Sequence, residues 1–415
     1  MSVAGVSEAQ FAPLVRAVAG EELDRAQVAE RFARAAWTTI AEPGDRDAGV
    51  LMEALGPPEA LERLTNGVEA DDLAAELADT AATEVTADQW TDALKRWRPR
   101  AGSAATLLAL RQAARFGMRM LVPGDADWPA QMGDLEAHAP FALWVRGDPA
   151  RLASLERSIA LVGARAATGY GEHVSIEAAS GLVDRGFAIV SGAAYGIDGA
   201  AHRAALASQG ITVAVLAGGL DRFYPSGHEQ LLGRIADRGV VVAEVPPGTT
   251  PTKWRFLLRN RLIAALSCAT VVVEAGWRSG SLNTAGHAAT LGRPLGAVPG
   301  PVTSAASAGC HRLLREFAAT CVTNADEIAE LAPVATGLAR DDATPASTPE
   351  RTPTDLTGSR LRVLDAVSDR TPRRVERVAQ LSGLALDRVR AELGLLELEG
   401  FVLERPSGWM RRKQD

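Results

Sequence analysis

The sequence predicts an α/β protein with an extended Rossmann-like, doubly wound parallel sheet, flanked by an N-terminal helical module and a C-terminal winged helix. Between residues 158 and 331, seven β-branched apolar runs alternate with amphipathic helical segments. Residues 24–116 show only helical periodicity, and residues 358–412 show three short helical segments followed by a hairpin pattern. Continuous apolar runs separated by helices are typical of a parallel sheet that is covered on both faces.

The first region, residues 1–116, is predicted to be a compact all-helical module. Its apolar residues recur at helical spacing, with short breaks between the segments. The break at Gly56 and Pro57 separates two short helices, as in a helix-hairpin-helix or SAM-like unit. A plain structural bundle explains the same pattern equally well.

Residues 117–332 are predicted to form the sheet domain. Two strands around MRMLV and FALWVRG lead into it, and the seven parallel strands are expected at SIALVG, FAIVSG, ITVAVLAGG, VVVAEV, ATVVVEAG, PLGAVPG and ATCVT. Ligands of open parallel sheets bind beyond the carboxyl ends of the strands. In this sequence those ends carry glycine-rich turns, which let backbone N–H groups approach a ligand and which precede helix N-termini that favour phosphate.

The C-terminal quarter is predicted to contain a linker and a winged helix. Residues 333–357 include four prolines and no apolar period, which indicates a flexible linker. In residues 358–412, Ala379, Gly383 and Val389 have helix-turn-helix spacing, and a turn at 406–408 provides the wing. The candidate recognition helix, around 386–396, has mixed charge, so contact with DNA and contact with another protein both stay open.

Motif spacing excludes several common kinds of site. A dinucleotide-binding G-x-G-x-x-G would need glycine where Arg165 and Thr168 stand. No G-x-x-x-x-G-K-[ST] loop or H-E-x-x-H occurs, and GWRSG has Arg278 where a nucleophile elbow needs serine. The three cysteines lack C-x-x-C and zinc-site spacing. We therefore expect no catalytic residue, no metal and no cofactor.

The chain is expected to be cytoplasmic and not to insert into a membrane. Its N-terminus lacks a basic segment followed by an apolar run. The longest apolar run, near residues 262–273, is too short to span a bilayer.

The chain has a net charge of −7, but one of its segments is strongly basic. Residues 245–315 contain eight cationic side chains and a single carboxylate, that of Glu274. A polyanionic ligand explains such a segment best, although a solvated basic face gives the same pattern. Cations interleaved with aromatic residues are typical of a groove for single-stranded nucleic acid. The candidate binding residues at the strand ends are Gly163, Arg165, Ser191, Gly192, Lys253, Phe256, Arg259, Asn260, Arg261, Ser279, Gly280 and Ser281.

Six motifs follow one another between residues 162 and 300. They are VGAR at 162–165, SGAAYGIDGAAH at 191–202, LAGGLDRFYP at 216–225, F-x-x-RNR-x-I at 256–263, VVVEAGWRSGSLNTA at 271–285 and GRPLGAVPG at 292–300. In this order they resemble the DNA-processing protein A family, also called DprA or Smf. The resemblance is close over residues 123–331. It implies an extended Rossmann fold whose basic pocket holds single-stranded DNA (ssDNA), loading of RecA recombinase onto that DNA in transformation or recombination, and a homodimer.

The resemblance also implies roles for individual residues. Arg165, Lys253 and the RNR residues at 259–261 match the family's DNA-contacting polar groups, and Phe256 matches an aromatic residue near the bases. On a helix, Lys253, Phe256 and Asn260 share one face; packing in the core is the alternative for Phe256. Departures from the family pattern are Leu257 for a proline, Ala243 for a serine, and Cys310-His311 for Thr-Asn.

Two other function classes share part of this pattern. Nucleotide-cleaving Rossmann enzymes of the LOG, or lysine-decarboxylase-like, group resemble it in fold and use a PGGxGTxxE motif with a catalytic glutamate. The matching loop here, SGSLNTAGHA, has no carboxylate. A winged-helix transcription regulator with a ligand-sensing Rossmann domain is the second alternative, and it predicts a preference for duplex DNA.

Overall fold

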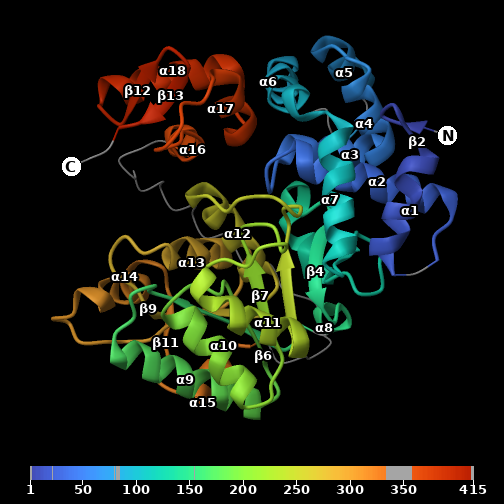
Figure 1. The fold of residues 1–415 in the computed structure, drawn as a ribbon. Coiled ribbons are helices and arrows are strands. Elements are labelled where there is room, and N and C mark those ends of the chain that lie inside the picture. Colours follow the sequence, from blue (N-terminus) through green and yellow to red (C-terminus); the bar gives the residue numbers. More distant parts are fainter. Residues whose placement is uncertain are drawn as a thin grey trace.

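The computed structural model describes residues 2–20, 22–78, 80, 85–153, 155–332 and 358–412. The predicted linker, 333–357, lies outside the described residues. Figure 1 shows the helical N-terminal region in blue and teal, the sheet with its helices from green to orange, and the C-terminal region in red.

The N-terminal region is a helical bundle around a tryptophan-rich core. The rings of Trp37 and Trp97 meet edge to face with centroids 5.2 Å apart, and Trp90 packs on Trp97 at 6.5 Å. Gly56, with φ of +78°, separates the third and fourth helices, as the Gly-Pro break predicts. The helices are α1 (Glu8–Ala19), α2 (Arg25–Ile40), α3 (Arg46–Leu55), α4 (Pro57–Thr65), α5 (Ala70–Glu76), α6 (Ala87–Trp97), η2 (Arg98–Arg100) and α7 (Ser103–Arg115).

The prediction of an all-helical module was wrong at its start. Strands β1 (Ser2–Val3) and β2 (Val6–Ser7) pair antiparallel. Ala4 and Gly5 between them both have positive φ, which is the turn geometry that suits a two-residue hairpin.

The central region contains a nine-stranded sheet, and all seven predicted parallel strands are confirmed. The strand order is β11-β10-β9-β5-β6-β7-β8-β4-β3, in which β4 and β3 extend the parallel strands with antiparallel pairing. The chain runs outward from β5 to β8 and then crosses back to β9, so a topological switch point lies between β5 and β9. The strands are β3 (Arg119–Leu121), β4 (Leu143–Gly147), β5 (Ser158–Gly163), β6 (Ala188–Ser191), β7 (Thr212–Leu216), β8 (Val240–Ala243), β9 (Ala269–Glu274), β10 (Leu295–Ala297) and β11 (Thr320–Cys321).

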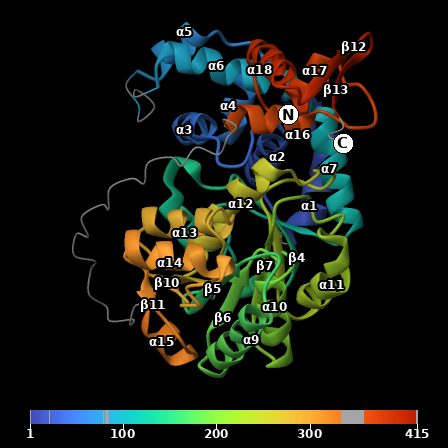
Figure 2. The ribbon, with the colours of Figure 1, turned by 90° about the vertical axis from the view of Figure 1, so that its left-hand side faces the viewer.

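Helices cover both faces of the sheet (Figures 1 and 2). Along β5, Ile159 and Leu161 pack on one face, whereas Ala160 and Val162 belong to the core on the other. The first face is covered by α9 (Gly169–Asp184), α10 (Ile197–Ala207), α15 (Ala325–Glu330) and, toward β8, α11 (Glu229–Arg238). The second face is covered by α12 (Lys253–Ala265), α13 (Ser281–Thr290) and α14 (Ala308–Glu316). Shorter helices in this region are η3 (Ala130–His138), α8 (Ala150–Ala153), η4 (Ser226–His228) and η5 (Ala305–Ser307).

The C-terminal region is a winged helix, as predicted. It consists of α16 (Gly358–Ala366), α17 (Val375–Ser382), α18 (Leu386–Leu398) and a hairpin of β12 (Val402–Arg405) and β13 (Gly408–Arg411). Gly383 ends α17 with φ of +66°, which is the left-handed conformation that glycine adopts without strain. Helix α16 lies on α12, and α17 lies on η2, so the winged helix contacts both other regions.

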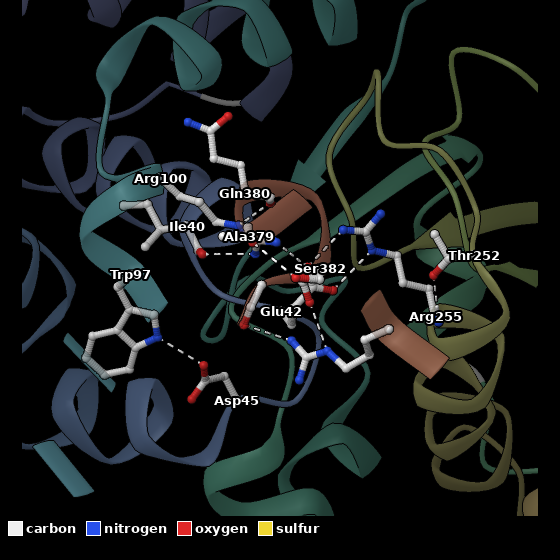
Figure 3. A network of polar contacts seen from close by, with 12 residues as sticks. Ile40, Glu42, Asp45, Trp97, Arg100, Thr252, Arg255, Ala379, Gln380 and Ser382 are labelled. Carbon is white, nitrogen blue, oxygen red and sulfur yellow. Dashed lines mark hydrogen bonds and ion pairs between the residues drawn. The ribbon is translucent and has the colours of Figure 1, made fainter. Parts of the chain in front are cut away.

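A buried carboxylate, that of Glu42, joins the three regions (Figure 3). It accepts a 2.8 Å hydrogen bond from Arg100 of the N-terminal region, and bonds of 2.8 and 3.1 Å from Arg255 of α12. Arg362 of α16 adds a third positive charge nearby. Burial alone would raise the pKa of Glu42, but the charges of the three arginines outweigh it and hold the pKa far below its ordinary value.

Within the described residues, no helix combines the length and the apolar character needed to cross a bilayer.

The Glu42 cluster predicts a stability effect. Glu42→Gln should lower the free energy of unfolding by ~3–5 kcal/mol, because removing one partner of a buried ion pair leaves the other charge uncompensated. A carboxylate whose pKa is depressed in the folded state stabilises the fold at pH values above its ordinary pKa of 4.5. That stabilisation is lost as the pH falls toward the folded-state pKa. The deficit of Glu42→Gln relative to the parent should therefore shrink below pH 4.5.

Thermal melts from pH 3 to pH 8 measure both effects. Glu316→Gln is the control, because Glu316 is exposed and its i,i+4 ion pair with Arg312 on α14 is worth ~0–1 kcal/mol. Equal melting temperatures for Glu42→Gln and Glu316→Gln at neutral pH would contradict the role of Glu42.

Candidate functional site

The loops after β5 and β9 flank the switch point of the sheet and open into a large cavity. Its volume is about 1730 Å³, which exceeds the ~300–1,000 Å³ of small-molecule pockets. The sheet edge provides one wall, residues around Glu42 and Leu108 of the N-terminal region provide another, and α17 of the winged helix provides a third. The cavity therefore has room for a segment of a polymer between the three regions.

Helix α12 carries two candidate residues at the cavity. Its first residue follows Thr252, whose hydroxyl caps the helix by accepting the Arg255 N–H at 3.2 Å. Lys253 is exposed and lines the cavity, and Phe256, one turn later, is half-buried and lines it as well. Because α12 is a continuous helix, Lys253, Phe256 and Asn260 lie along one side of it, as predicted, and all three border the cavity.

The ring of Phe256 lies among cationic and aromatic neighbours. The Arg165 guanidinium carbon is 4.7 Å from the ring centroid, and that of Arg259 is 5.8 Å away. The Tyr224 ring lies 5.7 Å from it at 51°. Arg165 and Tyr224 are exposed, so this cluster presents π-faces and a positive charge to the cavity.

Arg259 is buried beneath this cluster and holds two strand ends together. Its Nη1 donates to the Gly192 carbonyl at 2.9 Å and to the Val215 carbonyl. Burial lowers its pKa to about 10, against the opposing effect of Asp198. A Cβ at position 192 would lie 2.5 Å from the Arg259 guanidinium, so the close approach requires glycine.

Asn260 links α12 to the loop after β9. Its Nδ2 donates to the Gly280 carbonyl at 3.3 Å and to Asn283 Oδ1 at 3.1 Å. In the same loop the hydroxyls of Ser279 and Ser281 are 2.8 Å apart. Ser279, Gly280, Ser281 and, from the β5 loop, Gly163 all line the cavity.

Three candidate residues do not line the main cavity. Arg261 donates from both Nη atoms to Glu244 at 2.6 Å and also donates to the His138 carbonyl. The buried Ser191 hydroxyl donates to the Leu161 carbonyl at 2.6 Å and so ties β6 to β5. Gly192 lies behind Phe256 in a smaller pocket. Direct DNA contact by these residues stays a prediction.

The buried carboxylates at the strand ends are also occupied by protein partners. Asp198 accepts the backbone N–H groups of Gly192 and Ala194, at 3.2 and 3.3 Å. Glu274 accepts the Thr168 N–H at 2.8 Å and its hydroxyl at 2.7 Å. Among the described residues, no group of three or more His, Cys, Asp or Glu side chains is placed to hold a metal ion.

Two features of the site escape sequence reasoning. Tyr224 lies in the LAGGLDRFYP segment, and an aromatic residue in the loop after a predicted strand was a usable signal. The cationic residues Arg373 and Arg377 of the winged helix also line the cavity. No local pattern indicates this, because they lie in a different region of the chain from the strand ends that they face.

Comparisons with known proteins match this architecture. The family model described as DNA recombination-mediator protein A matches residues 119–333, and a DprA winged-helix model matches residues 347–408. The chain is 44% identical to a putative DNA processing protein DprA of Mycobacterium tuberculosis over 89% of this chain and 91% of the relative. It is 37% identical to protein Smf of Escherichia coli over 71% of this chain and 78% of the relative.

A solved structure agrees. The X-ray structure of DNA processing protein A from Streptococcus pneumoniae aligns with a TM-score of 0.57 and 27% identity, covering 74% of this chain and 98% of that one. The LOG-like enzyme alternative is therefore set aside. The chain belongs to the DNA recombination-mediator protein A (DprA/Smf) family, and it is a DNA-processing protein rather than an enzyme.

Proposed function

We propose that this protein binds ssDNA in the three-walled cavity and delivers it to RecA recombinase, acting in the cytoplasm as a homodimer. The cavity combines exposed cations with an exposed aromatic cluster, which is the arrangement that holds phosphates and stacks bases. Family membership supports a role in DNA recombination or transformation. RecA loading and the homodimer rest on the resemblance to the family.

In this proposal the candidate residues have two kinds of role. Arg165 and Lys253 contact phosphates, and Phe256 stacks on a base together with Tyr224. Backbone and hydroxyl groups of Gly163, Ser279, Gly280 and Ser281 provide further hydrogen bonds at the switch point. The buried Arg259, Asn260 and Arg261 hold the strand ends and loops in place through Gly192, Gly280 and Glu244.

Binding should prefer ssDNA over duplex and should weaken with salt. Two phosphate contacts predict a slope of log K against log[salt] of about −1.4 or steeper, since each contact to a single strand contributes about −0.7. Lys253→Ala should make the slope shallower by about 0.7. Fluorescence anisotropy with a dT oligonucleotide and a blunt duplex, each titrated at several salt concentrations, measures both quantities.

Lys95→Ala is the matched control, because Lys95 is an exposed lysine of α6 outside the cavity lining. An equal slope change in both variants would remove Lys253 from the site. Tighter binding to the duplex than to the oligonucleotide would instead favour the transcription-regulator alternative.

Stacking on Phe256 predicts a loss of affinity without a change in salt dependence. Phe256→Ala should weaken ssDNA binding by ~1–3 kcal/mol and leave the slope unchanged. Phe223→Ala is the control, because that ring also lies beside an arginine, 4.5 Å from Arg146, but does not line the cavity. Melts and titrations on the same preparations separate stacking from packing. A large drop in melting temperature with unchanged affinity in the folded fraction would assign Phe256 to the core.

Delivery to RecA predicts a kinetic effect. On ssDNA coated with single-strand-binding protein, addition of the protein should shorten the lag before RecA hydrolyses ATP. Lys253→Ala should shorten the lag less, in proportion to its lower DNA affinity. An unchanged or longer lag with the parent protein would refute loading while leaving ssDNA binding intact.

A further inference from the structure

The proposed ssDNA site leaves one wall of the cavity unexplained, the wall formed by the winged helix. Asp365 and Ala366 of α16, Arg373, and residues of α17 border the same cavity as Lys253 and Phe256. Arg100 also donates a 2.8 Å hydrogen bond to the Gln380 carbonyl, which fixes α17 beside the N-terminal region (Figure 3). This wall is therefore part of the site rather than a remote domain.

Apart from Arg278 in the loop after β9, the cations that line the cavity fall into two groups. Arg100 and Arg255 are paired with Glu42, and the charge of the buried Arg259 is opposed by that of Asp198. In contrast, no ion pair among the described residues involves Arg165, Lys253, Arg373 or Arg377. Of these four, Arg165 follows β5 and Lys253 begins α12, whereas the other two lie on the winged helix, so this unpaired positive charge faces the cavity from both sides.

Both winged-helix arginines are anchored in a way that leaves donors available. The backbone of Arg373 exchanges two hydrogen bonds with Trp409 of the wing, at 2.8 and 2.7 Å, and its Nη1 donates to the Ala366 carbonyl at 2.8 Å. Arg377, in the first turn of α17, donates from Nη1 to the Gln380 amide oxygen at 3.2 Å. A guanidinium has five N–H donors, so each keeps donors for a second acceptor.

The candidate recognition helix for duplex DNA, α18, does not lie at the cavity. No residue of α18 lines it. On that helix Arg388 pairs with the buried Glu392 at 2.7 Å, and Asp387 lies 3.8 Å from Lys95 of α6. The winged helix thus presents its preceding helix, α17, to the ligand.

We infer that Arg373 and Arg377 form a second phosphate subsite for ssDNA, opposite Arg165 and Lys253, and that the winged helix closes the groove over the strand. This inference rests on the proposed function, since the ligand is the phosphodiester backbone of the same strand. A strand held from two sides is bound through more phosphates than the sheet edge alone provides, and its affinity depends more steeply on salt.

The test is the salt dependence of dT oligonucleotide binding by full-length Arg373→Ala/Arg377→Ala. Two lost contacts should make the slope shallower by about 1.4. Arg370→Ala/Arg374→Ala is the matched control, because it removes the same charge from exposed positions of the same segment that do not line the cavity. Its slope should equal that of the parent protein.

Three further measurements keep the outcomes distinct. Arg373→Lys/Arg377→Lys should restore most of the slope, because lysine keeps the charge. If the slope instead depended on the hydrogen bond from Arg373 to the Ala366 carbonyl, the lysine variant would keep the shallow slope. Arg377→Ala alone, at an exposed position, should account for about 0.7 of the slope change. Lys253→Ala is measured in parallel. If Lys253→Ala makes the slope shallower but Arg373→Ala/Arg377→Ala does not, the second subsite is overturned and the proposed function is not. Tighter ssDNA binding by Arg373→Ala/Arg377→Ala has the same meaning. A parent protein without ssDNA binding overturns the proposed function itself.

Discussion

The arrangement of the three regions depends on one buried carboxylate. Glu42 lies where the N-terminal region, α12 and the winged helix meet, and the arginines around it come from all three. A buried charge cluster of this kind is costly to desolvate, and its strength comes from hydrogen bonds that satisfy the charges together. Because α12 also carries Lys253 and Phe256, the same cluster that holds the regions together fixes the helix that faces the cavity.

The basic segment that dominates the sequence contains side chains with different physical tasks. Arg261 is bound to Glu244, Arg255 to Glu42, and Arg259 to backbone carbonyls beneath Phe256. These guanidinium groups act inside the protein as multivalent donors that join loops far apart in sequence. Lys253 of this segment, and Arg165 outside it, are exposed at the cavity. Counting charges along the chain therefore overstates how many of them meet a ligand.

Much of the fold could be predicted from the sequence, because the seven parallel strands fall on β-branched apolar runs, most of which are followed by a glycine-containing turn. The winged helix was equally visible in its helix-turn-helix spacing. Contacts between regions could not be predicted in this way. Glu42 and Arg255 are separated by 213 positions, and no local sequence pattern indicates that they pair. The same limit concealed Arg377 at the cavity. The β1–β2 ribbon was missed because two-residue strands have no measurable periodicity.

The position of Trp254 gives the molecule an internal optical reporter. Its indole packs under Arg362 of α16, whose guanidinium carbon is 5.4 Å from the ring centroid, and against Gly358 at the start of that helix. The indole Nε1 is buried without a hydrogen-bond partner among the described residues. Separation of the winged helix from α12 would hydrate this ring and shift its fluorescence to longer wavelength. Because the chain contains eight tryptophans, the contribution of this ring is the part of the emission change that Trp254→Phe abolishes.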